Sequence, residues 1–188
     1  MTDVATIISA QKKDKKSLKI LFEQYYGIMK NICIRYAKDE LQSSELLNSG
    51  FYSMINSINE FEPGAIEFQK WLSDVLIKNS ISFLKSNERE YYVTTTAKAN
   101  DPDWDNKSTI MAKIFIEDLN AIPDSIIIQC IQELPPSHRA IFNLHLIDGY
   151  ELEEVSKIME INIETCKRNL ERGRNNFEKN IRSKVLLP

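Results

Sequence analysis

The chain has 188 residues, which suffices for one mid-sized domain or two small ones. Its 24 Lys and Arg residues stand against 27 Asp and Glu residues, and the net charge of −3 argues against nucleic-acid binding by the surface as a whole. Because no apolar run reaches about 18 residues and the N-terminus lacks a basic-then-apolar pattern, we expect neither a membrane span nor an export signal.

The first half of the chain is predicted to form four helices, because apolar residues recur there at helical spacing. Thr2 or Asp3 is a suitable cap for a short first helix that ends at Ala10. The next three helices are expected over 17–37, from Ser43 or Ser44 to about 61, and over 66–84. Pro63-Gly64 separates the last two of them.

The last third of the chain is also predicted to be helical, over 123–134, 136–147, 152–159 and 163–185. Residues 87–121 lack apolar periodicity and include an acidic stretch at 101–105, so they read as a linker that is extended or partly disordered. We therefore expect an all-α protein with two small helical domains, over 1–86 and 122–188, joined by this flexible linker.

The strongest local pattern is a helix-turn-helix at 151–175, formed by a short helix, a three-residue turn and a longer helix. In such motifs the first residues of the second helix face base edges in the major groove. Basic residues are also concentrated in this last stretch, which is typical of a DNA-binding helix. The candidate DNA-contacting residues are Glu164, Thr165, Lys167, Arg168 and Asn169, with Arg172 and Arg174 for the phosphates. An ordinary helical hairpin with a solvated basic face is the alternative.

Residues 134–181 resemble region four of bacterial sigma factors. The resemblance rests on the opening Leu134-Pro135, on Arg139 before Ile141-Phe142, on the Asp148-Gly149-Tyr150 corner, and on Glu154-Val155, Thr165, Lys167, Arg168 and Arg172-Gly173-Arg174. The first half independently resembles region two, through Leu21 to Tyr26, Arg35-Tyr36 and Phe68 to Leu72. Two matching regions in this order, with little between them, are similar to the extracytoplasmic-function group of sigma factors.

The resemblance implies three binding surfaces for two partners, core RNA polymerase and promoter DNA. Region two would bind polymerase through Glu45, Leu46, Leu47, Asn48 and Phe51. It would melt the minus-ten element and capture a flipped base through the loop 61–68 and the helix after it, with Phe61, Glu62, Ala65, Phe68, Trp71 and Lys78. For Phe68 and Trp71, plain core packing is an equally good interpretation. Region four would read the minus-thirty-five element through residues 164–174.

Two departures from the family pattern are informative. Gly50 lies inside a predicted helix, where glycine costs up to about 1 kcal/mol relative to alanine, so close approach to another surface would explain it. Ser73, Asp74 and Ile77 stand where the family commonly has aromatic and basic residues, so promoter binding by region two is expected to be weak. We hypothesise that a DNA-bound protein recruits the chain to its sites, since tethering raises the effective concentration.

Two other functions fit the same pattern. One is a helix-turn-helix regulator that does not engage polymerase and uses 1–86 for dimerisation or sensing. The other is a protein-interaction module that sequesters a regulator. An anti-sigma protein is a further candidate partner.

An enzyme is not expected, because the sequence has no Gly-rich phosphate loop, nucleophile elbow or metal-spaced Cys/His cluster. His138 and His145, seven residues apart, do not read as a catalytic pair. Cys33, Cys130 and Cys166 fit buried apolar positions in a cytoplasmic protein better than a disulfide framework or a zinc site. We therefore expect no cofactor, metal, membrane contact or small-molecule substrate.

Overall fold

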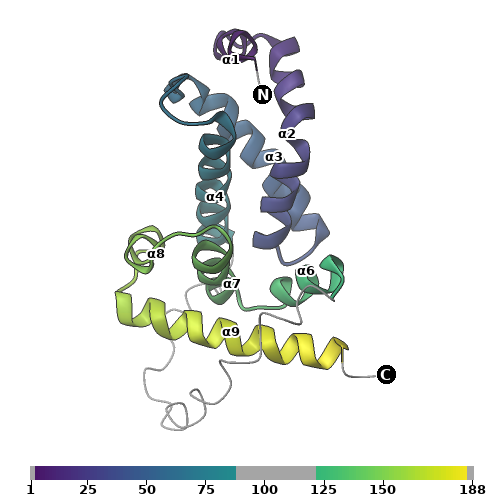
Figure 1. Ribbon diagram of the computed structural model, residues 1–188, viewed down its shortest axis with the longest axis vertical. Helices are drawn as coiled ribbons and strands as arrows, with labels where there is room; N and C mark the ends of the chain where they lie inside the picture. Colours follow the sequence, from purple (N-terminus) through teal and green to yellow (C-terminus); the bar gives the residue numbers. More distant parts are fainter. Residues whose placement is uncertain (1–2, 88–121, 186–188) are drawn as a thin grey trace. The chain divides into compact units, whose positions relative to one another are not determined.

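The computed structural model describes residues 3–87 and 122–185. Within these ranges all regular elements are helices, which confirms the predicted all-α class, and none is long and apolar enough to cross a membrane. The chain divides into two compact units, Met1–Asn87 and Glu88–Pro188 (Figure 1). The predicted linker over 87–121 lies outside the described residues, apart from Asn87.

The first unit is a bundle in which α2, α3 and α4 pack against one another and α1 packs against α2. Its elements are α1 (Val4–Gln11), α2 (Lys15–Tyr36), α3 (Glu40–Ser57), the short 3-10 helix η1 (Ile58–Glu60) and α4 (Phe68–Asn87). Fully buried aliphatic and aromatic side chains from all three long helices form its core, among them Leu21, Met29, Tyr36, Leu46, Met54, Leu72, Leu76 and Leu84.

Aspartates fix where the first three helices begin, since each accepts a hydrogen bond from a backbone amide of the first turn. Asp3 caps α1, Asp14 caps α2 and Asp39 caps α3; the donors are the amides of Ala5, Ser17 and Gln42, at 3.1, 2.8 and 2.8 Å. The predicted start of the third helix at Ser43 or Ser44 is therefore wrong. Ser43 lies inside α3 and is fully buried.

Close packing of α3 on α4 explains Gly50. A Cβ atom at this position would lie 2.5 Å from Cδ2 of Leu76, which no carbon pair tolerates. The expected close approach is confirmed, and the surface that approaches belongs to the same unit.

The second unit consists of α6 (Asp124–Gln132), α7 (Pro136–Phe142), the π-helical turn η3 (Asn143–Ile147), α8 (Leu152–Met159) and α9 (Ile163–Val185). A core cluster joins α6 and α7 to the distal half of α9, with Cys130, Ile131, Leu134, Phe142, Phe177 and Ile181. The Phe142 and Phe177 rings lie 5.0 Å apart. The long α9 is thus anchored along its length by the helices that precede it.

Arg139, on α7, is buried and hydrogen-bonds the C-terminal end of α6. Its side chain is 1% exposed, and Nη1 donates to the carbonyl oxygens of Gln132 and Leu134 at 2.8 and 3.2 Å. These carbonyls end α6, where unpaired acceptors and the helix dipole favour a cation. All three cysteines are buried, and burial raises the pKa of the Cys33 thiol to about 12, as expected for structural residues.

Candidate nucleic-acid and polymerase interfaces

The helix-turn-helix is formed by α8 and α9, and its turn is held by side chains on both sides. Glu151 and Glu154 form a capping box at the start of α8, with the Glu151 amide donating to Glu154 Oε2 at 2.9 Å. Ser156 Oγ donates to the Ile161 carbonyl at 2.8 Å, and the amide of Thr165 donates to Asn162 Oδ1 at 2.7 Å. The start of α9 is therefore fixed relative to α8.

The outer side of α9 presents most of the predicted DNA-contacting residues. Glu164, Lys167 and Arg174 are exposed, and Thr165, Arg168 and Arg172 are half-buried. Lys167 Nζ lies 3.1 Å from Glu164 Oε1, so these two side chains form an ion pair in the free protein. Lys167, Arg168, Arg172 and Arg174 together give this helix its surplus of positive charge.

The prediction that Asn169 contacts DNA is corrected by its burial. Asn169 was predicted to contact DNA together with Thr165, but it is 2% exposed. The inward stripe of α9 includes Cys166, Leu170 and Gly173, and Asn169 falls within it at helical spacing. Asn169 therefore does not present its amide to a groove.

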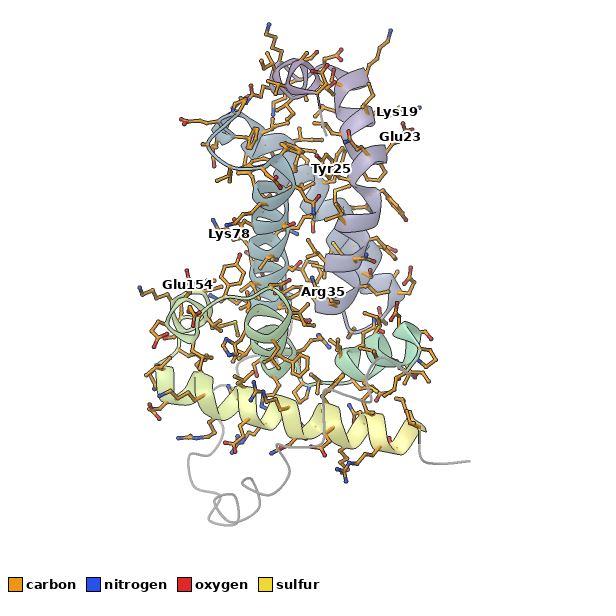
Figure 2. The ribbon with its side chains drawn as sticks, in the orientation of Figure 1. Lys19, Glu23, Tyr25, Arg35, Lys78 and Glu154 are labelled. Carbon is orange, nitrogen blue, oxygen red and sulfur yellow. The ribbon has the colours of Figure 1, made fainter. Side chains whose placement is uncertain are left out.

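An aromatic cluster underlies the predicted minus-ten loop. The Phe68 ring lies 5.1 Å from Phe61, 5.2 Å from Tyr25 and 5.5 Å from Trp71. Figure 2 shows Tyr25 pointing between α2 and α4. Phe61 and Phe68 are 4% and 6% exposed, whereas Trp71 is half-buried. Phe61 and Phe68 thus pack in the core, and Trp71 is the ring of this cluster with an edge available to a ligand.

The loop between these rings is solvent-facing. Every residue from 62 to 67 is exposed, including the predicted Glu62 and Ala65. Lys78 is exposed as well, on the side of α4 that faces away from α2 (Figure 2). Gly64 adopts a φ of +95°, which turns the chain and which side-chain-bearing residues rarely adopt.

Gln11 on α1 holds the start of this loop and was missed in the sequence. Its Nε2 donates to the carbonyl oxygens of Ile58 and Phe61, at 3.0 and 2.9 Å. Lys13 Nζ donates to the Ile55 carbonyl. These contacts join segments more than 40 residues apart, so no local pattern indicated them.

The predicted polymerase-binding residues divide between the inside and the outside of α3. Leu46 and Leu47 are 0% and 7% exposed, so they belong to the core and their prediction as partner-facing residues is corrected. They share the inward stripe with Gly50 and Met54. Glu45 and Asn48 are exposed, and Phe51 is half-buried.

The exposed face of α3 includes two apolar residues that sequence reasoning missed. Leu41 and Tyr52 are 73% and 66% exposed. With Glu45 and Asn48 they follow a spacing of four, three and four residues, which places all of them on one side of a helix. We call these four residues the α3 face. At its edge the Phe51 ring lies 4.8 Å from Phe22, and Phe22 lies 5.5 Å from the 45% exposed Tyr26.

Comparison with known proteins shows which family the chain is similar to. The family described as "Sigma-70, region 4" matches residues 124–176, which contain α8 and the first half of α9. The "ECF RNA polymerase sigma-E factor" of Haemophilus influenzae is 22% identical, over 96% of each chain. The "ECF RNA polymerase sigma factor SigW" of Bacillus subtilis is 21% identical, over 94% of this chain and 95% of that one.

These matches support an extracytoplasmic-function sigma factor. The fold of the chain agrees with that of the sigma factor RpoE in a co-crystal structure with the anti-sigma factor NepR from Bartonella quintana. That likeness has a TM-score of 0.50 at 18% identity and covers 90% of this chain and 98% of that one.

The surface around the loop 62–67 and α4 has no surplus of positive charge. Glu62 and Glu67 are exposed and Asp74 is half-buried, against the exposed Lys70 and Lys78 and the half-buried Lys85. The helix-turn-helix differs, because its recognition helix is basic. The two candidate DNA-binding surfaces are therefore electrostatically unlike each other, as the substitutions at Ser73 and Asp74 indicated.

Proposed function

We propose that the chain binds core RNA polymerase in the cytoplasm and directs it to promoter DNA. The observation that carries this proposal is the basic, outward side of α9 within a helix-turn-helix that matches sigma region four. The turn is pre-organised by Ser156 and Asn162, so the helix would enter a major groove without reorganisation. Lys167 and Arg168 would contact base edges or phosphates of the minus-thirty-five element, and Arg172 and Arg174 the backbone.

The first unit would engage polymerase and the minus-ten element on separate surfaces. The α3 face offers exposed Leu41 and Tyr52 flanking polar Glu45 and Asn48, a combination suited to a protein interface. The loop 62–67 and the exposed edge of Trp71 would hold an unstacked base of the non-template strand, with the buried Phe61 and Phe68 as a rigid support.

Recruitment by a DNA-bound protein is part of the same proposal. Because the loop and α4 carry balanced charge, the first unit supplies few phosphate contacts of its own from this surface. A tethering partner would raise the local concentration of the sigma factor at its promoters without new DNA contacts.

A pull-down of the tagged chain with purified core polymerase, followed by run-off transcription on a pool of genomic fragments, tests the proposal. Stable association with discrete transcripts would establish an autonomous sigma factor. Association without selective transcripts would support the polymerase role and the need for a DNA-bound partner. Absence of association would overturn the proposal in favour of a regulator that acts without polymerase.

A further inference from the structure

The turn between α1 and α2 carries a concentrated positive charge. Lys12, Lys13, Lys15 and Lys16 are all exposed, and Asp14 is the one acid among them. The Asp14 carboxylate is already engaged as the cap of α2, where it accepts from the amide and the hydroxyl of Ser17 at 2.8 Å each. The segment 12–16, which we call the lysine turn, therefore has a surplus of three positive charges on exposed side chains.

Helix stability does not account for Lys15 and Lys16. Lys15 and Lys16 are the first two residues of α2, whose first turn holds no acidic residue. The N-terminal end of a helix carries partial positive charge, so cations there are unfavourable and carboxylates are favoured. The neighbouring lysines also repel one another. Lys15 and Lys16 therefore carry a local cost in helix stability.

The lysine turn lies beside the start of the loop 62–67. Gln11, immediately before it, donates to the carbonyls of Ile58 and Phe61, and Lys13 reaches the carbonyl of Ile55. Figure 1 shows α1 at the same end of the first unit as the connection between α3 and α4. The positive charge is thus attached to the end of the unit that presents Trp71 and the exposed loop.

The loop and α4 need positive charge from elsewhere if they hold a DNA strand. Their own charges balance, with Glu62, Glu67 and Asp74 against Lys70, Lys78 and Lys85. Single-stranded DNA is held by bases on aromatic rings together with cations that follow the backbone. The ring of Trp71, next to the loop 62–67, would stack on a base. The surplus of cations that the strand's phosphates need lies on the lysine turn.

We propose that the lysine turn binds the sugar–phosphate backbone of the single DNA strand whose base is held at the loop 62–67 and Trp71. This inference rests on the proposed function, because it needs the loop to engage melted promoter DNA. The lysines contact phosphates and carry no sequence information. They supply the salt-dependent part of binding that the loop and α4 lack.

The double variant Lys15→Gln/Lys16→Gln tests this inference in holoenzyme assembled from core polymerase and the full chain. The probe is a labelled promoter duplex from the strongest run-off template, with a pre-melted bubble over its minus-ten element. If both lysines contact phosphates, the slope of log affinity against log salt concentration falls by about 1.4, at about 0.7 per contact on a single strand. The minus-ten base preference and the affinity for core polymerase stay unchanged. The free variant unfolds at the same or a higher temperature, because two cations leave a helix N-terminus.

Lys30→Gln/Lys38→Gln is the control for net charge, since it removes two positive charges near the opposite end of the 22-residue α2. Lys30 pairs with Glu40, so the unfolding temperature of this variant is measured as well. Its salt slope should equal that of the wild type. Equal slopes for the test and control variants would overturn the inference while leaving the proposed function standing. A loss of core-polymerase affinity in the test variant would also overturn it, because the lysines would then contact protein. Failure of the wild-type holoenzyme to bind the bubble would overturn the proposed function itself, and the inference with it.

Discussion

Single residues in this protein are constrained by neighbours that lie far away in the sequence. Gly50 and Gly27 both occupy helices, yet their surroundings differ. A Cβ atom at Gly50 would lie 2.5 Å from buried Leu76, whereas nothing lies within 4 Å of a Cβ atom at Gly27. The same substitution should therefore have opposite effects at the two sites.

We predict that Gly50→Ala destabilises the first unit by about 1 to 2 kcal/mol, since overpacking costs about 1–3 kcal/mol and alanine regains up to about 1 kcal/mol of helix propensity. Gly27→Ala should instead stabilise it, by up to about 1 kcal/mol. Denaturant unfolding of each variant measures both values. Adding Leu76→Val to Gly50→Ala should recover part of the loss, and a purely additive double mutant would contradict the steric explanation.

Elements were easier to predict than the direction in which their side chains point. The helices at 152–159 and 163–185 were predicted with the bounds that the structure shows, because their periodicity and turn are strong. Leu46 and Leu47 follow the apolar spacing of their helix, but the family resemblance assigned them to a polymerase contact, which their burial contradicts. The inward position of Asn169 was missed, because a polar residue gives no apolar signal. Gln11 gave no local signal, since its acceptors at Ile58 and Phe61 are 47 and 50 residues away.

The exposed side of α3 carries a prediction for the element as a whole. Leu41→Glu/Tyr52→Glu should weaken binding of core polymerase at least tenfold, or about 1.4 kcal/mol, because it places charge in an apolar contact. Its stability should change little, since both side chains are more than half exposed. Binding measured by fluorescence anisotropy and unfolding measured by circular dichroism separate the two effects.

Ile20→Glu is the control for this face, because Ile20 is 49% exposed and lies on α2. It should bind polymerase as the wild type does. Leu46→Ala should behave differently from either variant and cost about 2–5 kcal/mol in stability, since Leu46 is fully buried. Normal polymerase binding by Leu41→Glu/Tyr52→Glu would rule out the α3 face as the contact.

At the scale of the whole molecule, the two units should respond differently to acid. The two histidines of the chain, His138 and His145, lie in the second unit. His138 is 6% exposed, and burial, with a smaller effect of Arg172, lowers its pKa to about 4. An unfolded histidine has a pKa of about 6.5, so the unfolded state takes up a proton more readily than the folded state. This contribution to stability is present above about pH 6.5 and is lost as the pH falls towards 4.

By pH 5 the loss should reach about 2 kcal/mol, which differential scanning calorimetry would record as a lower unfolding temperature for the second unit. The first unit has no histidine, so its transition should move less between pH 7 and pH 5. His138→Leu removes the titrating group, and because both ring nitrogens lack hydrogen-bond partners among the described residues, it leaves no broken bond behind. In that variant the second transition should become nearly independent of pH over this range, with His145 unchanged as the internal reference. An equally steep pH dependence in His138→Leu would assign the acid sensitivity to other groups.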